Sequence, residues 1–558
     1  MKLPVFASAL AFAQSVAAAD VEYQLTPLLS EQALTAVQVD LRFAGDADGE
    51  TLLDLPDSWG GEEELWRELE DIQVIAGAEI ADGETPSARI LRHPPGSRIH
   101  LRYRIVQNWK KGPPTAADGN PYRPIIQPTW FHLIGNAALI LPELEESATA
   151  RIRVDGLPPG WSFASDLEHA GLTLGQARAS ISVGGDYRIV SNPSDGLRVA
   201  IRGDWEFADE QFLASVARIT QGHRRFWKDA DAPFLVSMTN LVIPEPGQFS
   251  LGGTGLEDAF AFFATPNVDE RRIARLLAHE ALHTWIPSRI GNLPATDEAA
   301  DYWLSEGFTE FYTARLMVKE GSWSPQEFAV DLNEMLAAYA VSPGRALPNA
   351  RVVSDFWKDS HIQQLPYQRG RLVATLWDAQ LRASSEQNFD DLVHAMRDRA
   401  KAGSELTAVA LFREVAAEMG LDVADGLREH IESGVPIVLP EKLFTPCGNI
   451  VTRQVPEFHR GFDIDATSAN QNIISGTDPD SPAHAAGLRD GMKLLRRAAG
   501  EIGNAAIEIE YVVLDGDQER SIRYLPRGKG GYDLQSLQLD PELDAEGRAR
   551  CIQVLGGR

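Results

Sequence analysis

Cysteine and positive charge are scarce in this chain. The 558 residues include 2 cysteines, Cys447 and Cys551, so at most one disulfide can form and a disulfide-rich scaffold is excluded. Lys and Arg number 52 against 80 Asp and Glu, which gives a formal net charge of −28. Such an acidic excess repels phosphate backbones, and no local basic patch interrupts it, so no nucleic-acid partner is expected.

Long apolar runs, fixed-period repeats and low-complexity tracts are also missing. After Asp20 no uninterrupted apolar stretch of about 18 residues occurs, so no membrane span is predicted in the mature chain. Hydrophobic residues at 44% and charged residues at 24% are typical of a globular protein. The length is too great for one ordinary core, so several domains are expected.

The first residues resemble a secretory signal peptide. Met1 to Pro4 supply one positive charge, Val5 to Ala13 are small and apolar, and Ala17-Ala18-Ala19 precede Asp20. We therefore expect residues 1–19 to be a signal peptide and the protein to be exported, either periplasmic or secreted; a buried first helix is the alternative. In an exported chain a disulfide between the two cysteines is favoured over two free thiols.

Three domains are predicted after the signal peptide, which makes the fold class multidomain α+β. Residues 20–200 alternate with period two and predict a β-sandwich-like domain. Residues 201–445 are mostly helical, and residues 446–558 return to strand patterns. Helices are expected at 207–227, 269–285, 302–318, 326–340 and 369–381, and strands at 21–25, 36–43, 99–105, 234–238, 473–475 and 507–513.

One helix of the middle domain carries the spacing of a metal site. His279 and His283 are four residues apart, so both imidazoles lie on one helix face and can bind one cation. Glu280 is about 100° around the helix axis and can reach a water on that cation. Zinc takes nitrogen and carboxylate ligands and keeps one position open for catalysis. A pair of ordinary helical histidines is the alternative interpretation.

A third ligand is expected from the next helix. Glu306 lies in Ser305-Glu306-Gly307, flanked by aromatic residues, after a stretch long enough for a loop and a returning helix. Glu310 lies one turn further along the same face and is the rival ligand. The aromatic surroundings favour Glu306.

These motifs together resemble the glycyl-aminopeptidase family of zinc peptidases, which belongs to the thermolysin-like group. The resemblance is carried by His279 to Trp285 and Trp303 to Thr309, and Thr284 to Arg289 is similar to the family's run to an Arg. It implies an N-terminal β domain, a thermolysin-like mostly helical catalytic domain over 201–445 and a C-terminal PDZ domain over 446–558. It also implies one Zn²⁺ per chain, held by two His and one Glu.

Two further elements are similar to that family. Gly253, Gly255 and Glu257 lie in a Gly-Leu-Glu strand of the kind that holds a substrate's free amine, although Asp258 stands where the family more often has His or Asn. Glu257 can pair with the α-ammonium, and the glycine backbone can pair with the peptide. An acidic loop without this role is the alternative interpretation.

The second element begins the helix expected at 369–381. Tyr367 lies in a segment similar to the family's Tyr-x-Lys-Gly element, with Arg369 in place of the Lys, and the resemblance implies that its phenol donates to the oxyanion. A packing tyrosine is the alternative. Tyr312 is a second candidate, but its position inside the Glu306 helix favours packing.

The C-terminal segment resembles bacterial PDZ domains. Gly461-Phe462-Asp463-Ile464 is similar to their carboxylate-binding loop, and Asp480 to Gly491 is similar to the helix and turn that follow. Gly487 can end the short helix in the left-handed conformation. The carboxyl terminus of a peptide is therefore an expected partner, with a purely structural module as the alternative.

The resemblance implies an exported zinc aminopeptidase that acts on peptides with a free N-terminus and a small first residue, Gly or Ala. In the implied mechanism zinc lowers the pKa of a bound water, Glu280 takes its proton and passes it to the leaving amine, and Tyr367 shares the oxyanion's charge with the metal. The alternatives are a zinc endopeptidase, in which Glu257 does not select the free amine, and a PDZ-bearing envelope binding protein with an inactive peptidase domain.

Overall fold

The structure is a computed structural model that describes residues 19–110, 112–114, 122–145, 147–168, 172–192, 196–230, 232–243, 249–256, 258–294 and 296–557. The predicted signal peptide falls almost entirely outside these ranges. The chain divides into two compact units, which are described separately; one comprises residues up to Asn292 with Arg397–Ala408, and the other comprises the remainder. The predicted domain boundaries stay a prediction.

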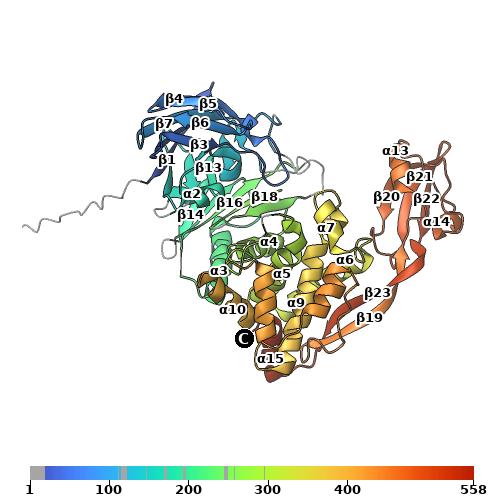
Figure 1. The fold of residues 1–558 in the computed structure, drawn as a ribbon. Helices are drawn as coiled ribbons and strands as arrows, with labels where there is room; N and C mark the ends of the chain where they lie inside the picture. Colours follow the sequence, from blue (N-terminus) through green and yellow to red (C-terminus); the bar gives the residue numbers. More distant parts are fainter. Residues whose placement is uncertain are drawn as a thin grey trace, which may run out of the picture. The chain divides into compact units, whose positions relative to one another are not determined.

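The first unit begins with three sheets (Figure 1). The chain alternates buried and partly exposed residues along β1, and this period-two pattern places one face of the strand in an apolar core with Tyr23 and Leu41. The strand order of the first sheet is β11 (Ala150–Val154), β1 (Val21–Ser30), β2 (Ala33–Ala44), β7 (Arg98–Ile105) and β4 (Leu69–Ala76). The order of the second sheet is β10 (Leu141–Pro142), β3 (Glu50–Asp54), β6 (Ala88–Arg92) and β5 (Glu79–Asp82). The order of the third sheet is β12 (Ser162–Ser165), β13 (Ile181–Gly185), β9 (Trp130–Ile134) and β8 (Ile125–Gln127).

A fourth sheet of the same unit leads to the candidate site. Its order is β14 (Arg188–Asn192), β15 (Leu197–Arg202), β16 (Phe234–Asn240), β18 (Ala259–Ala264) and β17 (Leu251–Gly255). Strands β15, β16 and β18 are parallel, and β18 is buried along its whole length. Strand β17 pairs antiparallel with β18 and forms the edge of the sheet. Two helices belong to this part, α3 (Asp209–Trp227) and α4 (Glu270–Leu282).

The second unit is helical and ends in β structure. Helix α9 lies alongside α5 (Figure 1), and nearly all of α5 is buried, as its apolar sequence requires. The helices from α5 onward are α5 (Tyr302–Lys319), α6 (Pro325–Val341), α7 (Asn349–Asp355), α8 (Ser360–Gln363), α9 (Leu365–Ser384), α10 (Phe389–Lys401), α11 (Ala408–Glu418) and the short α12 (Ala424–Gly426). Helices α10 and α11 extend across the boundaries of the units.

The C-terminal β part has two sheets and three helices. Strands β19 (Gly448–Phe458) and β23 (Arg527–Leu539) form a long antiparallel pair, and β20 (Lys493–Ala499), β21 (Ile509–Asp515) and β22 (Gln518–Tyr524) form the other sheet. The helices are α13 (Ile464–Ala469), α14 (Pro482–Ala485) and α15 (Ala545–Gly556). The predicted disulfide is confirmed, because Cys447 and Cys551 are bonded. The multidomain α+β fold class is confirmed as well.

The PDZ-like motif is only partly reproduced. Gly487 follows α14 with a φ of 103°, as predicted for a residue that ends this helix. The predicted strand at 473–475 is wrong, since only an isolated bridge between Ile473 and Lys493 forms there. The expected carboxylate-binding loop leads directly into α13, whose N-cap Asp463 accepts hydrogen bonds from the amides of Asp465 and Ala466. Peptide binding at this loop stays a prediction.

No helix within the described residues is long and apolar enough to cross a membrane.

Candidate metal centre and active site

Three side chains form a group that can hold a metal ion. His279, His283 and Glu306 each offer one ligand atom, and these atoms all lie within 4.8 Å of one another. His279 lies in the last turn of α4, His283 caps the end of that helix, and Glu306 lies in the second turn of α5. Among the described residues no other group of His, Cys, Asp and Glu has this arrangement. The predicted ligands are therefore brought together.

The donor set fits zinc. Nδ1 of His283 lies 3.0 Å from the backbone oxygen of Ile286, so this nitrogen carries the proton and Nε2 is left to bind a metal. The His279 and His283 rings are nearly perpendicular, at 81°, with centroids 5.1 Å apart. Two imidazole nitrogens and one carboxylate leave a fourth tetrahedral position open, as in catalytic zinc sites.

The turn after α4 is held by partly buried polar contacts and an aromatic stack. Asp229 accepts hydrogen bonds from Nε1 of Trp285 at 2.6 Å and from Arg289 at 2.5 Å. The Trp285 ring stacks on Trp227 with an interplanar angle of 6°. These contacts fix the segment that follows His283 and give Arg289 a structural partner.

The rival ligand Glu310 has a different neighbour. Its carboxylate lies 3.7 Å from the guanidinium of Arg371 on α9, and Arg371 also pairs with Asp331 at 2.7 Å. Glu310 is absent from the three-residue metal group. The choice of Glu306 over Glu310 agrees with this geometry.

Glu280 is held by the edge strand of the fourth sheet. The backbone N–H of Gly255 donates to Oε2 of Glu280 at 2.9 Å. A Cβ atom on Gly255 would lie 2.8 Å from both this oxygen and the backbone oxygen of Glu280, so glycine allows the close approach. Gly253, also on β17, is equally close to its neighbours: an added Cβ would lie 2.4 Å from the backbone oxygen of Ala261.

The outer edge of β17 is available for strand pairing, because β18 is its only partner in the described part of the chain. This agrees with the predicted role of Gly253 in pairing with a peptide, whereas the N–H of Gly255 already donates to Glu280. Glu257, the predicted ligand of the substrate amine, lies outside the described residues.

The two tyrosine candidates differ clearly. Tyr312 is fully buried and its hydroxyl donates to the backbone oxygen of Phe389 at 2.9 Å, so the expected packing role is confirmed. Tyr367 is half-buried in the first turn of α9 and packs against a cluster that includes Tyr302 and Phe356. The helix begins at Leu365, earlier than predicted, so Tyr367 belongs to the helix and does not precede it.

Two further phenols were not found from the sequence. Burial, followed by the negative charge of Glu280, raises the pKa of Tyr122. Burial, a hydrogen bond to Glu298 and the charges of Glu298 and Glu306 raise the pKa of Tyr302. Both phenols therefore stay protonated near carboxylates of the site. Tyr122 lies in an irregular loop without a pattern that would have indicated it.

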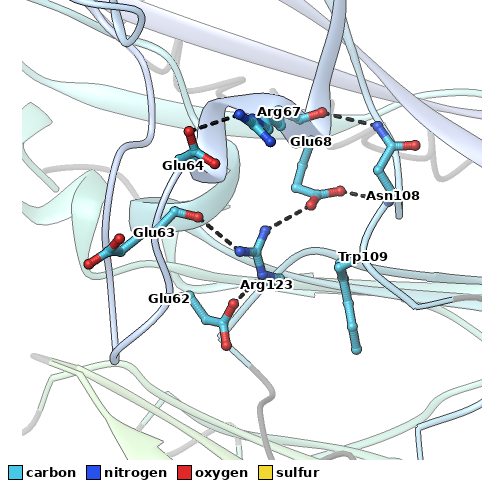
Figure 2. A pocket seen from close by; sticks show the side chains of 8 residues that line it. All are labelled: Glu62, Glu63, Glu64, Arg67, Glu68, Asn108, Trp109 and Arg123. Atoms are coloured by element: carbon cyan, nitrogen blue, oxygen red, sulfur yellow. Dashed lines mark hydrogen bonds and ion pairs between the residues drawn. The ribbon is translucent and has the colours of Figure 1, made fainter. Parts of the chain in front are cut away.

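A separate cavity of about 420 Å³ lies in the N-terminal part (Figure 2). Arg123 points between Glu62 and Glu68 and binds both carboxylates, and Arg67 pairs with Glu64 at 2.8 Å. The two arginines therefore neutralise part of the negative charge of the glutamates that line the cavity.

Comparison with known proteins gives a family for the segment that carries the metal group. The family model of the M61 glycyl aminopeptidases matches residues 272–373. This segment is therefore similar to the M61 glycyl aminopeptidases. The predicted resemblance and the prediction of a metallopeptidase are thereby confirmed.

Individual proteins are also similar to this chain in sequence or in structure. Leukotriene A-4 hydrolase of Xenopus laevis is 30% identical over 99 residues, which is 17% of this chain and 15% of that protein. The structure is similar to that of the aminopeptidase N family protein from Idiomarina loihiensis, with a TM-score of 0.66 and 12% identity over 96% of this chain and 100% of that chain. The M1 zinc metallopeptidase from Deinococcus radiodurans has a TM-score of 0.45 and 16% identity over 75% of this chain and 95% of its own. The likeness to the Idiomarina loihiensis structure extends the shared fold beyond residues 272–373.

Proposed function

We propose that this protein is an exported zinc aminopeptidase that removes one small residue, Gly or Ala, from the N-terminus of a peptide. The observation that carries the proposal is the convergence of His279, His283 and Glu306, with Glu280 between the two histidines in the sequence and held by Gly255. The family match of residues 272–373 supports it.

The metal would be held by the two imidazoles and the Glu306 carboxylate. The chemistry supplied by zinc when bound is polarisation of the scissile carbonyl and a lowered pKa of water. Glu280 acts as the general base: its carboxylate takes a proton from the attacking water and returns it to the leaving amine. The Gly255 N–H donates to Oε2 of Glu280 and so orients the carboxylate for this transfer.

Two other residues of the chain complete the mechanism. Tyr367 donates a hydrogen bond to the oxyanion that develops on the substrate carbonyl. Glu257 pairs with the α-ammonium of the substrate, while the peptide backbone lies against the edge of β17. Selection of the free amine by Glu257 limits cleavage to the first peptide bond.

The hypothesis of an exopeptidase is tested with a pair of tetrapeptides that begin with Gly, one with a free N-terminus and one N-acetylated. We expect the zinc-loaded protein to release glycine from the free peptide and to leave the acetylated one intact, as followed by mass spectrometry. Equal internal cleavage of both peptides would indicate an endopeptidase. No cleavage of either would favour a binding protein.

Export is part of the proposal. It is supported by the signal-peptide pattern of residues 1–19 and by the Cys447–Cys551 disulfide, a bond typical of oxidising compartments. Expression of the full chain in a bacterial host should yield a processed protein that begins at Asp20 outside the cytoplasm. An unprocessed cytoplasmic protein would contradict export.

A further inference from the structure

Helices α5 and α9 touch through two glycines. A Cβ atom on Gly370 of α9 would lie 1.8 Å from the backbone oxygen of Trp303 and 2.5 Å from the Cα of Gly307 on α5. A Cβ atom on Gly307 would lie 2.2 Å from the Cα of Gly370. Distances below 3.0 Å are not found for real Cβ atoms, so only glycine permits the two backbones to come this close.

This contact lies next to two residues of the candidate site. Gly307 directly follows the metal ligand Glu306. Tyr367 lies between Pro366 and Gly370, and both of these contact Gly307: an added Cβ there would lie 3.0 Å from the backbone oxygen of Pro366. The helical turn that carries Tyr367 is therefore packed on the residue that follows Glu306.

The residues on both sides of Gly370 fix α9 in place. Arg369 is 2% exposed, and its Nη2 donates to the backbone oxygens of Leu347 at 2.5 Å and Arg345 at 3.0 Å. Arg371 pairs with Asp331 and Glu310, as described above. Arg369 stands where the family's element has Lys, and it anchors the start of α9 to the loop between α6 and α7.

We propose that the Gly307–Gly370 contact, secured by Arg369, is a positioning element that sets the Tyr367 phenol relative to the metal ligand Glu306. The proposal rests on the proposed function, in which Tyr367 donates to the oxyanion. The two glycines and Arg369 act through Tyr367 and are not assigned a contact with substrate.

The size of the effect follows from the distances. A methyl group on Gly370 must move from 1.8 Å to at least 3.0 Å from the Trp303 oxygen, so the helices must separate locally by about an ångström. An oxyanion donor acts only at hydrogen-bond distance, and a 1 Å misplacement of a catalytic group costs about 100-fold in rate.

The test is a double-mutant cycle with Gly370→Ala and Tyr367→Phe, measured as steady-state hydrolysis of Gly-p-nitroanilide. We expect Gly370→Ala to lower kcat about 100-fold with little change in KM and with zinc content retained. In the Tyr367→Phe background the same substitution should cost no more than about twofold, because the group that it displaces is already missing. Gly344→Ala is the matched control, since an added Cβ there meets nothing closer than 3.5 Å.

Three outcomes would overturn the proposal: wild-type kcat in Gly370→Ala, multiplication of the two single effects in the double variant, or loss of zinc from Gly370→Ala. Loss of zinc would mean that the contact positions Glu306. These outcomes differ from failure of the proposed function, in which the zinc-loaded wild type itself is inactive or Tyr367→Phe is as active as wild type.

Arg369→Lys covers the case in which Gly370→Ala does not fold. The lysine keeps the charge but can reach fewer carbonyls, so we expect a smaller loss of kcat, about fivefold, that disappears in the Tyr367→Phe background. An equal loss in both backgrounds would contradict a role through Tyr367.

Discussion

Gly255→Ala should slow catalysis by displacing the general base. In the structure the Gly255 N–H donates to Oε2 of Glu280 at 2.9 Å, and an added Cβ would lie 2.8 Å from that oxygen and from the backbone oxygen of Glu280. Ordinary contacts begin near 3.4 Å, so the carboxylate and strand β17 must move apart by about 0.6 Å. We expect kcat to fall about 10- to 100-fold, because a general base must stay within hydrogen-bond reach of the water.

Gly252→Ala is the control for this experiment. Gly252 lies on the same strand, but among the described residues, its two chain neighbours aside, no heavy atom lies within 4 Å of the position that its Cβ would take. The assay is hydrolysis of Gly-p-nitroanilide over a range of substrate concentrations, with zinc content measured for each variant. We expect Gly252→Ala to stay within about twofold of wild type. If zinc-loaded Gly255→Ala keeps the wild-type kcat, or if only KM rises, the argument that β17 orients Glu280 is refuted.

Two further predictions concern the metal ligands and the effect of acid. Glu306→Gln should lose zinc on dialysis whereas Glu310→Gln should retain it, as measured by elemental analysis; loss of zinc from both would mean that Glu310 also ligates. Burial lowers the pKa of His132 to about 3, well below its value of about 6.5 in the unfolded chain. Below pH 6.5 the unfolded state therefore binds more protons than the folded state. The free energy of unfolding consequently falls as the pH drops, by about 1.4 kcal/mol per pH unit. His132→Leu should remove that part of the pH dependence in urea unfolding between pH 4.5 and 6.5, and an unchanged slope would contradict the assignment.

The sequence was sufficient for those parts of the site that depend on local spacing. His279 and His283 share a face of α4 because of helix periodicity alone, and the predicted helix at 302–318 is α5 to within one residue. The alternating segments at 21–25, 36–43 and 99–105 form β1, β2 and β7. In each case the residues whose pattern predicts the helix or strand lie within a few positions of one another in the sequence.

Contacts between segments that are distant in the sequence could not be predicted from the sequence. Glu306 and Glu310 are equivalent by spacing, and what separates them is Arg371, which comes from α9. Gly370 has a low helix propensity but lies inside α9. Glycine is needed there because the backbone of α5 fills the space that a side chain would take. The hydrogen bond from Gly255 to Glu280 joins a strand edge to a helix and has no sequence signature.

The central claim is a zinc-dependent aminopeptidase that uses Glu280 as its general base. The most direct measurement is hydrolysis of Gly- and Ala-p-nitroanilide by the purified, zinc-loaded protein, beside Glu280→Gln and beside wild type treated with a chelator. We predict turnover in wild type that is lost with the chelator, returns with added zinc, and falls at least about 100-fold in Glu280→Gln while zinc stays bound. Turnover that persists in zinc-loaded Glu280→Gln, or that survives complete removal of zinc, would contradict the account.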